Sequence, residues 1–226
     1  MNSNFYLVPG AIILGGLILA GAIFLVRGNA PEEIKGDPAA VRPVSPEEHI
    51  IGSPTAPVVV IEYSDIDCPY CKQFQQTMAQ IMTEYGPTGN VAWVYRHFPL
   101  VRNHPNAARH AEAAECVDSI AGGDSFWRFI DALQAAAPDQ NQFNPDNYGT
   151  VVKSLGVSED TFNQCMAGGQ FRPTVEADTK NALEAGASGT PYLVVLVKGN
   201  DPIPVSGALP YASLKATLDE ALSKVK

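Results

Sequence analysis

Two of the four cysteines stand close together, in the sequence Cys68-Pro69-Tyr70-Cys71. Two thiols at this spacing can form a disulfide that opens and closes, because a thiolate attacks a disulfide sulfur in thiol–disulfide exchange. An apolar run precedes the pair and a helical pattern follows it, which predicts that Cys68 opens a helix. The unpaired N–H groups and the positive end of the helix dipole there favour the Cys68 thiolate. The pattern is therefore typical of a redox-active dithiol.

A zinc site is the alternative interpretation of the same two cysteines. Structural zinc sites usually combine two such pairs, or one pair with two suitably spaced histidines. His97, His104 and His110 do not supply that spacing, and they are interpreted as packing or surface residues. The sequence therefore predicts no metal site, and nothing in it indicates a cofactor.

The segments around the dithiol predict an α/β unit. Residues 57–64 form a continuous apolar, β-branched run, which is typical of a buried central strand. A helix of about 16 residues is expected after Cys68, ending at Gly86-Pro87. Residues 91–98 form a second strand, which after a helical crossover is expected to run parallel to the first.

Glu62 is anomalous in the first of these strands, because the residues around it are apolar. Burial would raise the pKa of its carboxyl group and make it a candidate for proton transfer. The alternative is a carboxylate at the strand end that faces solvent. Asp65 and Asp67 are interpreted as solvated loop acids, and Trp93 and Trp127 as core residues.

The rest of the chain predicts a helical insertion followed by a return to strands. About residues 103–186 show helical periodicity without a β-branched run. Residues 192–197 and 203–205 flank a turn-like segment and predict an antiparallel hairpin, and leucines from 209 to 222 predict a last helix. The expected order is βαβ, a helical insertion, then ββα.

The N-terminal segment predicts a membrane anchor. The first charged side chain is Arg27, and the 22 residues from 5 to 26 are apolar or small, which as a helix would span about 33 Å. A cleaved signal peptide is the alternative, but the segment is longer than a usual signal-peptide core and no Lys or Arg precedes it. We therefore predict a retained anchor over residues 1–27, an extracytoplasmic linker over 28–52 and a folded domain over 53–226.

The cysteines indicate on which side of the membrane the domain lies. Arg27 alone weakly favours a cytoplasmic domain, but a disulfide donor has no lasting use in a reducing cytosol. The domain is therefore expected on the periplasmic or extracytoplasmic side of the cytoplasmic membrane. In that compartment Cys116 and Cys165 are predicted to form a structural disulfide, with buried free thiols as the alternative.

Three separated segments resemble the DsbA-like branch of the thioredoxin superfamily. They are residues 60–74, residues 95–100 (Tyr-Arg-His-Phe-Pro-Leu) and Gly189-Thr190-Pro191. The resemblance covers about residues 49–226 and three motifs in the expected order, which is more specific than one CxxC sequence. It implies a thioredoxin fold with a cis-proline at Pro191 beside the disulfide.

The resemblance also implies a role for individual residues. Cys68 corresponds to the nucleophile, Cys71 to the resolving thiol and Glu62 to the buried acid that relays protons to Cys71. The residues expected to tune the redox properties are Pro69, Tyr70 and Thr190. Tyr70 departs from the family pattern, because the best-known strong oxidants of the family carry His at this position, and the redox strength therefore stays open.

The expected function is the donation of disulfides to reduced exported proteins by a membrane-anchored monomer. A disulfide isomerase or reductase, or a weakly active substrate-binding module of the same fold, is the alternative. The resemblance implies a membrane quinone-linked oxidant that recycles the dithiol. Fifteen basic residues against twenty-four acidic ones give a net charge of −9, which excludes a nucleic-acid partner because phosphate binding needs clustered basic residues.

Overall fold

The computed structural model describes residues 36–45, 47–137 and 143–225. The chain divides into two units at Gly36, and the described residues all belong to the second unit. The predicted anchor at residues 5–26 lies outside the described residues. Within the described ranges, no helix combines the length and the apolar character that a membrane crossing requires.

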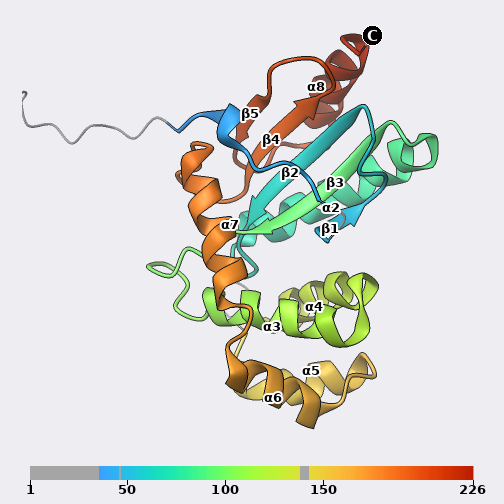
Figure 1. The fold of residues 1–226 in the computed structure, drawn as a ribbon. Coiled ribbons are helices and arrows are strands. Elements are labelled where there is room, and N and C mark those ends of the chain that lie inside the picture. The colour runs from blue at the N-terminus through green and yellow to red at the C-terminus, as the bar shows by residue number, and fades with distance from the viewer. Residues whose placement is uncertain (1–35, 46, 138–142, 226) are drawn as a thin grey trace, which may run out of the picture. The chain divides into compact units, whose positions relative to one another are not determined.

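A five-stranded mixed sheet forms the centre of this unit (Figure 1). Its strands, in the spatial order β1-β3-β2-β4-β5, are β1 (His49–Ile51), β2 (Val58–Ser64), β3 (Val91–His97), β4 (Tyr192–Val197) and β5 (Ile203–Ser206). β2 and β3 run parallel, and β4 and β5 form an antiparallel hairpin. Both pairings confirm the prediction from sequence. β2 is also antiparallel to β4, and β1 adds to β3 as an antiparallel edge strand.

Helices cover both faces of the central strands. The α-helices are α2 (Pro69–Tyr85), α3 (Ala107–Ala121), α4 (Gly123–Ala136), α5 (Tyr148–Ser154), α6 (Glu159–Gly168), α7 (Arg172–Glu184) and α8 (Tyr211–Ser223), and the 3-10 helices are η2 (Pro38–Ala40), η3 (Gly86–Thr88) and η4 (Pro145–Asn147). Val60 of β2 packs in one hydrophobic cluster with α2 and α8, and Ile61 packs in another with α7. Because side chains alternate between the two faces of a strand, Glu62 lies on the same face as Val60, toward α2.

The middle of the chain forms the predicted helical insertion. Helices α3 to α6 pack around a hydrophobic core that includes Phe126 and Phe129, and they lie below the sheet in the view of Figure 1. Cys116 of α3 and Cys165 of α6 are joined by a disulfide with an S–S distance of 1.97 Å. The thioredoxin-type order of βαβ, helical insertion and ββα is therefore present.

The folded unit begins earlier than the sequence predicts. A linker is expected over residues 28–52, but the unit starts at Gly36 and His49–Ile51 is a strand of the sheet. Buried Arg96 of β3 holds this segment, because its Nη2 donates to Glu48 Oε1 at 2.7 Å and to the Arg42 carbonyl at 2.8 Å. Such contacts between distant parts of the chain leave no local signal, and a three-residue strand is too short to show a period.

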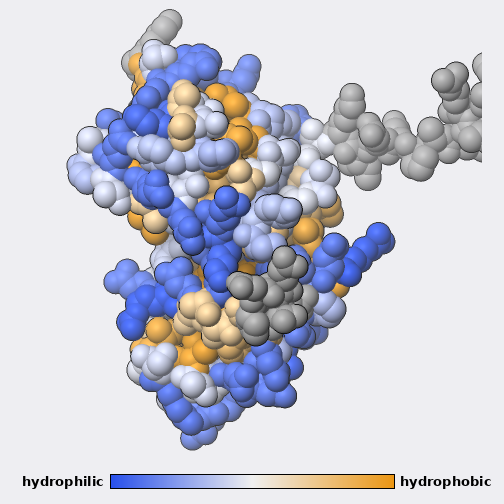
Figure 2. All heavy atoms as spheres, turned by 180° about the vertical axis from the view of Figure 1, so that it is seen from behind, coloured by the Kyte–Doolittle hydropathy of each residue, from blue (hydrophilic) through white to orange (hydrophobic). Residues whose placement is uncertain are grey.

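The surface of the described residues is mainly polar. Seen from behind, hydrophilic side chains cover much of this face, and hydrophobic ones show between them in patches (Figure 2). Large apolar side chains that are exposed in the described ranges include Tyr70, Val101 and Leu183. The first of these lies between the two cysteines of the dithiol.

Candidate active site

Cys68 occupies the N-cap position of α2, with an extended backbone and Pro69 as the first helical residue. Its Sγ lies 3.5 Å from the carbonyl oxygen of Thr190. The pKa of Cys68 is lowered to about 6, because the Cys71 side chain donates a hydrogen bond to it and backbone N–H groups of the first turn do the same, although burial opposes the shift. The helix start therefore stabilises a thiolate at neutral pH.

Cys71 lies three residues further along α2 and is fully buried. Burial raises the pKa of the Cys71 thiol well above its ordinary value, and the neighbouring Cys68 sulfur raises it further. The structure has no bond between the two sulfurs. The dithiol is thus asymmetric, with one sulfur that ionises easily and one that holds its proton.

Glu62 is buried in the centre of the sheet, on the face toward α2. The indole Nε1 of Trp93 donates a hydrogen bond to its Oε2 at 2.9 Å, whereas its Oε1 has no hydrogen-bond partner among the described residues. Burial raises the pKa of Glu62 to about 7. The charge of Glu62 in turn contributes to the raised pKa of Cys71, so the two groups are electrostatically coupled across the space between β2 and α2.

Pro191 follows a cis peptide bond from Thr190 and directly precedes β4. The Thr190 carbonyl faces the Cys68 sulfur, and the Thr190 hydroxyl has no hydrogen-bond partner within the described ranges. Three separated segments therefore meet at this point: the end of β2, the start of α2 and the loop before β4.

Pro69 and Tyr70 lie on the surface between the two cysteines. The side chain of Tyr70 is 64% exposed, and it is the backbone of Tyr70, not its side chain, that hydrogen-bonds to Cys68 and lowers the pKa of that thiol. The exposed Tyr70 thus lies beside Cys68, which is itself only 5% exposed.

The prediction that Asp65 and Asp67 are solvated loop acids is wrong. The side chain of Asp65 is fully buried and accepts hydrogen bonds from the Leu100 N–H at 2.7 Å and from the Asp67 N–H at 2.8 Å, with His104 Nδ1 at 2.8 Å. Burial, with a smaller effect of the Asp65 charge, raises the pKa of Asp67 to about 7, and burial lowers the pKa of nearby His110 to about 4. The segment between β3 and α3, together with α3 itself, covers these carboxyl groups. Amino-acid composition alone does not reveal this burial.

The helical insertion contacts the dithiol helix directly. Lys72, the residue after Cys71, donates from its Nζ to the carbonyl of Gln134 in α4 at 2.6 Å, and Gln134 Nε2 donates to the Ile66 carbonyl at 3.4 Å. These contacts connect α4 to the chain on both sides of Cys68, at Ile66 before it and at Lys72 after it. The sequence carries no signal for them, since a lysine and a glutamine in helical segments are usually solvent-facing.

The three histidines and two tryptophans interpreted from the sequence as packing, surface or core residues are mostly buried. His97 and His110 are buried, and His104 is partly exposed. Trp93 is a core residue and partly buried Trp127 packs on it, with ring centroids 4.6 Å apart.

A family profile described as Thioredoxin matches residues 44–220. BdbD from Bacillus subtilis is 25% identical, with a TM-score of 0.69 over 81% of this chain and 97% of that chain. The alpha-DsbA1 of Wolbachia pipientis is 20% identical, with a TM-score of 0.68 over 80% of this chain and 94% of that chain. The chain belongs to the thioredoxin family, and it shares the fold of the alpha-DsbA1 and BdbD structures.

A second group of relatives is much longer than this chain. A Na(+)/H(+) antiporter NhaA 1 of Salinispora arenicola is 34% identical over 156 residues, which make up 68% of this chain and 22% of the antiporter. The chain therefore spans about a fifth of the length of the curated relatives that it matches.

Proposed function

We propose that this protein is a thiol:disulfide oxidoreductase that donates the Cys68–Cys71 disulfide to reduced exported proteins. The observation that carries the proposal is the placement of the two thiols, with Cys68 at the N-cap of α2 facing the Thr190 carbonyl and Cys71 buried one turn further on. The opposite pKa shifts of the two thiols agree with this placement. A thiol of low pKa attacks readily at neutral pH and also leaves readily from a mixed disulfide. The pair therefore suits repeated exchange with substrate thiols.

The proposed reaction begins with the Cys68–Cys71 disulfide. A substrate thiolate attacks Cys68 Sγ, a bond forms between the two sulfurs, and the bond to Cys71 breaks so that Cys71 leaves as a thiolate. Because the pKa of Cys71 is raised, this thiolate takes up a proton, for which the carboxyl of Glu62 is the proposed donor. A second substrate thiolate then attacks the substrate sulfur of the mixed disulfide, and Cys68 leaves as a thiolate. The substrate loses two electrons and the protein gains them.

The proposal also assigns a place and a recycling partner. Residues 1–27 would anchor the protein in the cytoplasmic membrane, with the thioredoxin domain on the extracytoplasmic side, where disulfides persist. A membrane quinone-linked oxidant would return the dithiol to the disulfide, as the DsbA-like family implies. The ion transport in the names of the antiporter relatives is not part of the proposal, because the match covers only about a fifth of those proteins.

The test is the oxidation of a reduced, unfolded model protein by the oxidised full chain. We expect Cys68→Ser to abolish oxidation, because no other described thiol combines a helix start with a lowered pKa. The matched variant Cys71→Ser has no disulfide to donate and should not oxidise the reduced model protein either. When it is mixed instead with a disulfide-bonded form of that protein, its Cys68 thiolate should attack the disulfide and form a mixed disulfide that lacks Cys71 to resolve it. Oxidation that survives in Cys68→Ser would refute the proposal.

An isomerase or reductase is the second candidate, and Tyr70 is the observation that favours it. The family's best-known strong oxidants carry His at this position, whereas the Tyr70 side chain is exposed and contributes nothing to the lowered pKa of Cys68. A weakly active binding module would instead hold unfolded chains equally well after Cys68→Ser. Oxidation of the model protein separates this last alternative from an enzyme.

A further inference from the structure

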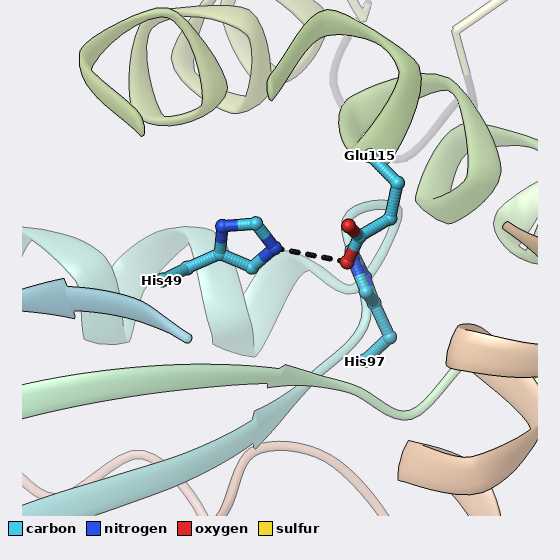
Figure 3. A group of neighbouring side chains, drawn as sticks. All are labelled: His49, His97 and Glu115. Carbon is cyan, nitrogen blue, oxygen red and sulfur yellow. Dashed lines mark hydrogen bonds and ion pairs between the residues drawn. The ribbon is translucent and has the colours of Figure 1, made fainter. Parts of the chain in front are cut away.

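Three side chains that are far apart in the sequence meet away from the dithiol. His49 opens β1, His97 ends β3, and Glu115 lies in α3. Their side chains are at most 9% exposed, and their nitrogen and oxygen ligand atoms all lie within 4.8 Å of one another. Figure 3 shows the His49 ring and the Glu115 carboxylate pointing toward each other, with His97 beside them.

Two of the three separations within this cluster match ligands around one small metal ion, and the third is at most 4.8 Å. His49 Nε2 lies 2.9 Å from Glu115 Oε1, and His97 Nε2 lies 3.2 Å from the same oxygen. Zinc binds histidine nitrogen and carboxylate oxygen at about 2.0–2.2 Å in tetrahedral geometry, which places neighbouring ligand atoms roughly 3.3 Å apart. A zinc ion would therefore need only small adjustments of these side chains.

One ligand atom of the cluster has no hydrogen bond of good geometry. His97 Nε2 is buried and makes no hydrogen bond to any residue that the structure describes, although it lies close to the Glu115 carboxylate. A buried polar atom without a hydrogen bond is costly and rare in native proteins, and a bound ion is one of the explanations for such an atom. An ion on this nitrogen would satisfy it.

The two imidazole rings are held in place by packing. The His49 ring stacks on Phe126 with ring centroids 3.5 Å apart and an interplanar angle of 6°, and His97 contacts the edge of the same ring at 5.8 Å. Asp118 Oδ1 lies 4.0 Å from His49 Nδ1, on the side where metal-binding histidines commonly face a carboxylate. The rings thus need little ordering when a metal binds.

A path for the ion is present as well. His49 and Glu115 line a cavity of about 450 Å³, large enough for water. Asp178 and Glu48 on its wall are ion-paired with arginines, whereas the carboxylate of Glu115 faces the two histidines. Water from the cavity could complete a tetrahedral site.

We propose that His49, His97 and Glu115 bind one Zn²⁺ ion, with a water molecule as the fourth ligand. Two imidazoles and one carboxylate are a common zinc donor set. The ion would tie the edge strand β1 and the end of β3 to α3 of the helical insertion. The sequence predicts no metal site because these ligands come from three separate elements and show no short motif spacing.

The test uses the full chain, freed of metal by a chelator and with Cys68 and Cys71 oxidised so that thiolates do not compete for zinc. We expect calorimetric titration with Zn²⁺ to show one saturable site. X-ray absorption of the zinc-loaded wild type should show nitrogen and oxygen ligands at about 2.0–2.2 Å, including two imidazoles and no sulfur. This measurement needs no variant, so a folding defect cannot obscure it.

The variants His97→Gln and Glu115→Gln should each weaken zinc binding by more than about tenfold. Mutation of a residue that only hydrogen-bonds to a metal ligand already lowers metal affinity by about that factor. His104→Gln is the matched control and should bind zinc like the wild type, because His104 lies outside the cluster and pairs with Asp65. Absence of a saturable site, sulfur in the X-ray absorption spectrum, or undiminished binding by a folded His97→Gln variant would overturn the proposal.

Discussion

Cys68 and Cys71 differ because of where the start of α2 places them. Cys68 lies at the N-cap, where N–H groups and the Cys71 side chain hydrogen-bond to its sulfur, and Cys71 lies one turn into the helix against the buried face of the sheet. The same residue type therefore becomes a nucleophile at one position and a proton-holding thiol at the other.

Alkylation of the reduced protein should report this difference. The rate at which iodoacetamide modifies Cys68 should rise about tenfold per pH unit below pH 6 and level off above it, because the pKa of Cys68 is about 6. Cys71 should stay unmodified. In Cys71→Ala the midpoint should move to higher pH, since the largest stabilising hydrogen bond is lost. A wild-type midpoint near the ordinary thiol pKa would contradict the assignment.

Glu62 makes a second prediction at this scale. Burial raises the pKa of Glu62 to about 7, so the folded protein keeps the carboxyl protonated to a higher pH than the unfolded chain does. The contribution of Glu62 to the free energy of unfolding is therefore highest at low pH and falls as the pH rises through 7. Between pH 5 and pH 8 the reduced wild type should lose about 2–3 kcal/mol of unfolding free energy relative to Glu62→Gln. Urea unfolding at the two pH values measures this difference.

A matched control separates this effect from general charge loss. Glu176 is exposed. The variant Glu176→Gln should show the same dependence of unfolding free energy on pH as the wild type. Parallel profiles for the wild type and Glu62→Gln would show that Glu62 does not change its protonation between pH 5 and pH 8 on folding.

At the scale of elements, the sequence predicts the sheet better than the contacts around it. The apolar runs at 57–64 and 91–98 predict two parallel strands, and 192–197 with 203–205 predict an antiparallel hairpin, because apolar runs, turn residues and a helical crossover are local signals. The edge strand β1 is missed, since its three residues carry no period. Burial of Asp65 and the meeting of His49 with Glu115 are missed as well, because both depend on how the helical insertion packs.

Arg96 should control the early start of the fold. It is 1% exposed and holds Glu48 and the backbone of Arg42. Arg96→Met would leave the Glu48 carboxylate with the half-exposed Arg42 as its remaining ion-pair partner, which should cost up to about 3 kcal/mol. Urea unfolding should show this loss, and hydrogen exchange of residues 36–51 should become faster.

The exposed Arg102 provides the control for that substitution. Arg102→Met should change the unfolding free energy by less than about 0.5 kcal/mol, as is usual for surface positions. If Arg96→Met behaves like Arg102→Met, the segment before β1 is held by other contacts.

For the whole molecule, the dithiol lies where the sheet unit meets the helical insertion. Lys72 and Gln134 connect α2 to α4, and the Cys116–Cys165 disulfide fastens α3 to α6 within the insertion. A lasting disulfide is typical of oxidising compartments. The fold is therefore consistent with a domain that works outside the cytosol.

Protease digestion of spheroplasts or protoplasts tests that location. If the domain is extracytoplasmic, added protease should digest the unit that begins at Gly36 in unlysed cells, while a cytoplasmic marker protein stays intact. The expectation follows from the disulfide chemistry and opposes the weak bias of Arg27. A domain protected until the cells are lysed would place it in the cytosol.

The most direct test of the proposed oxidase is the reduction potential of the Cys68–Cys71 pair, measured by equilibration of the full chain with glutathione. A thiolate stabilised in the reduced protein makes the disulfide oxidising, as in the strongest oxidants of this kind at about −120 mV. The lowered pKa of Cys68 predicts a value toward that end of the range. A value near about −270 mV, typical of thioredoxin as a reductant, would contradict the account.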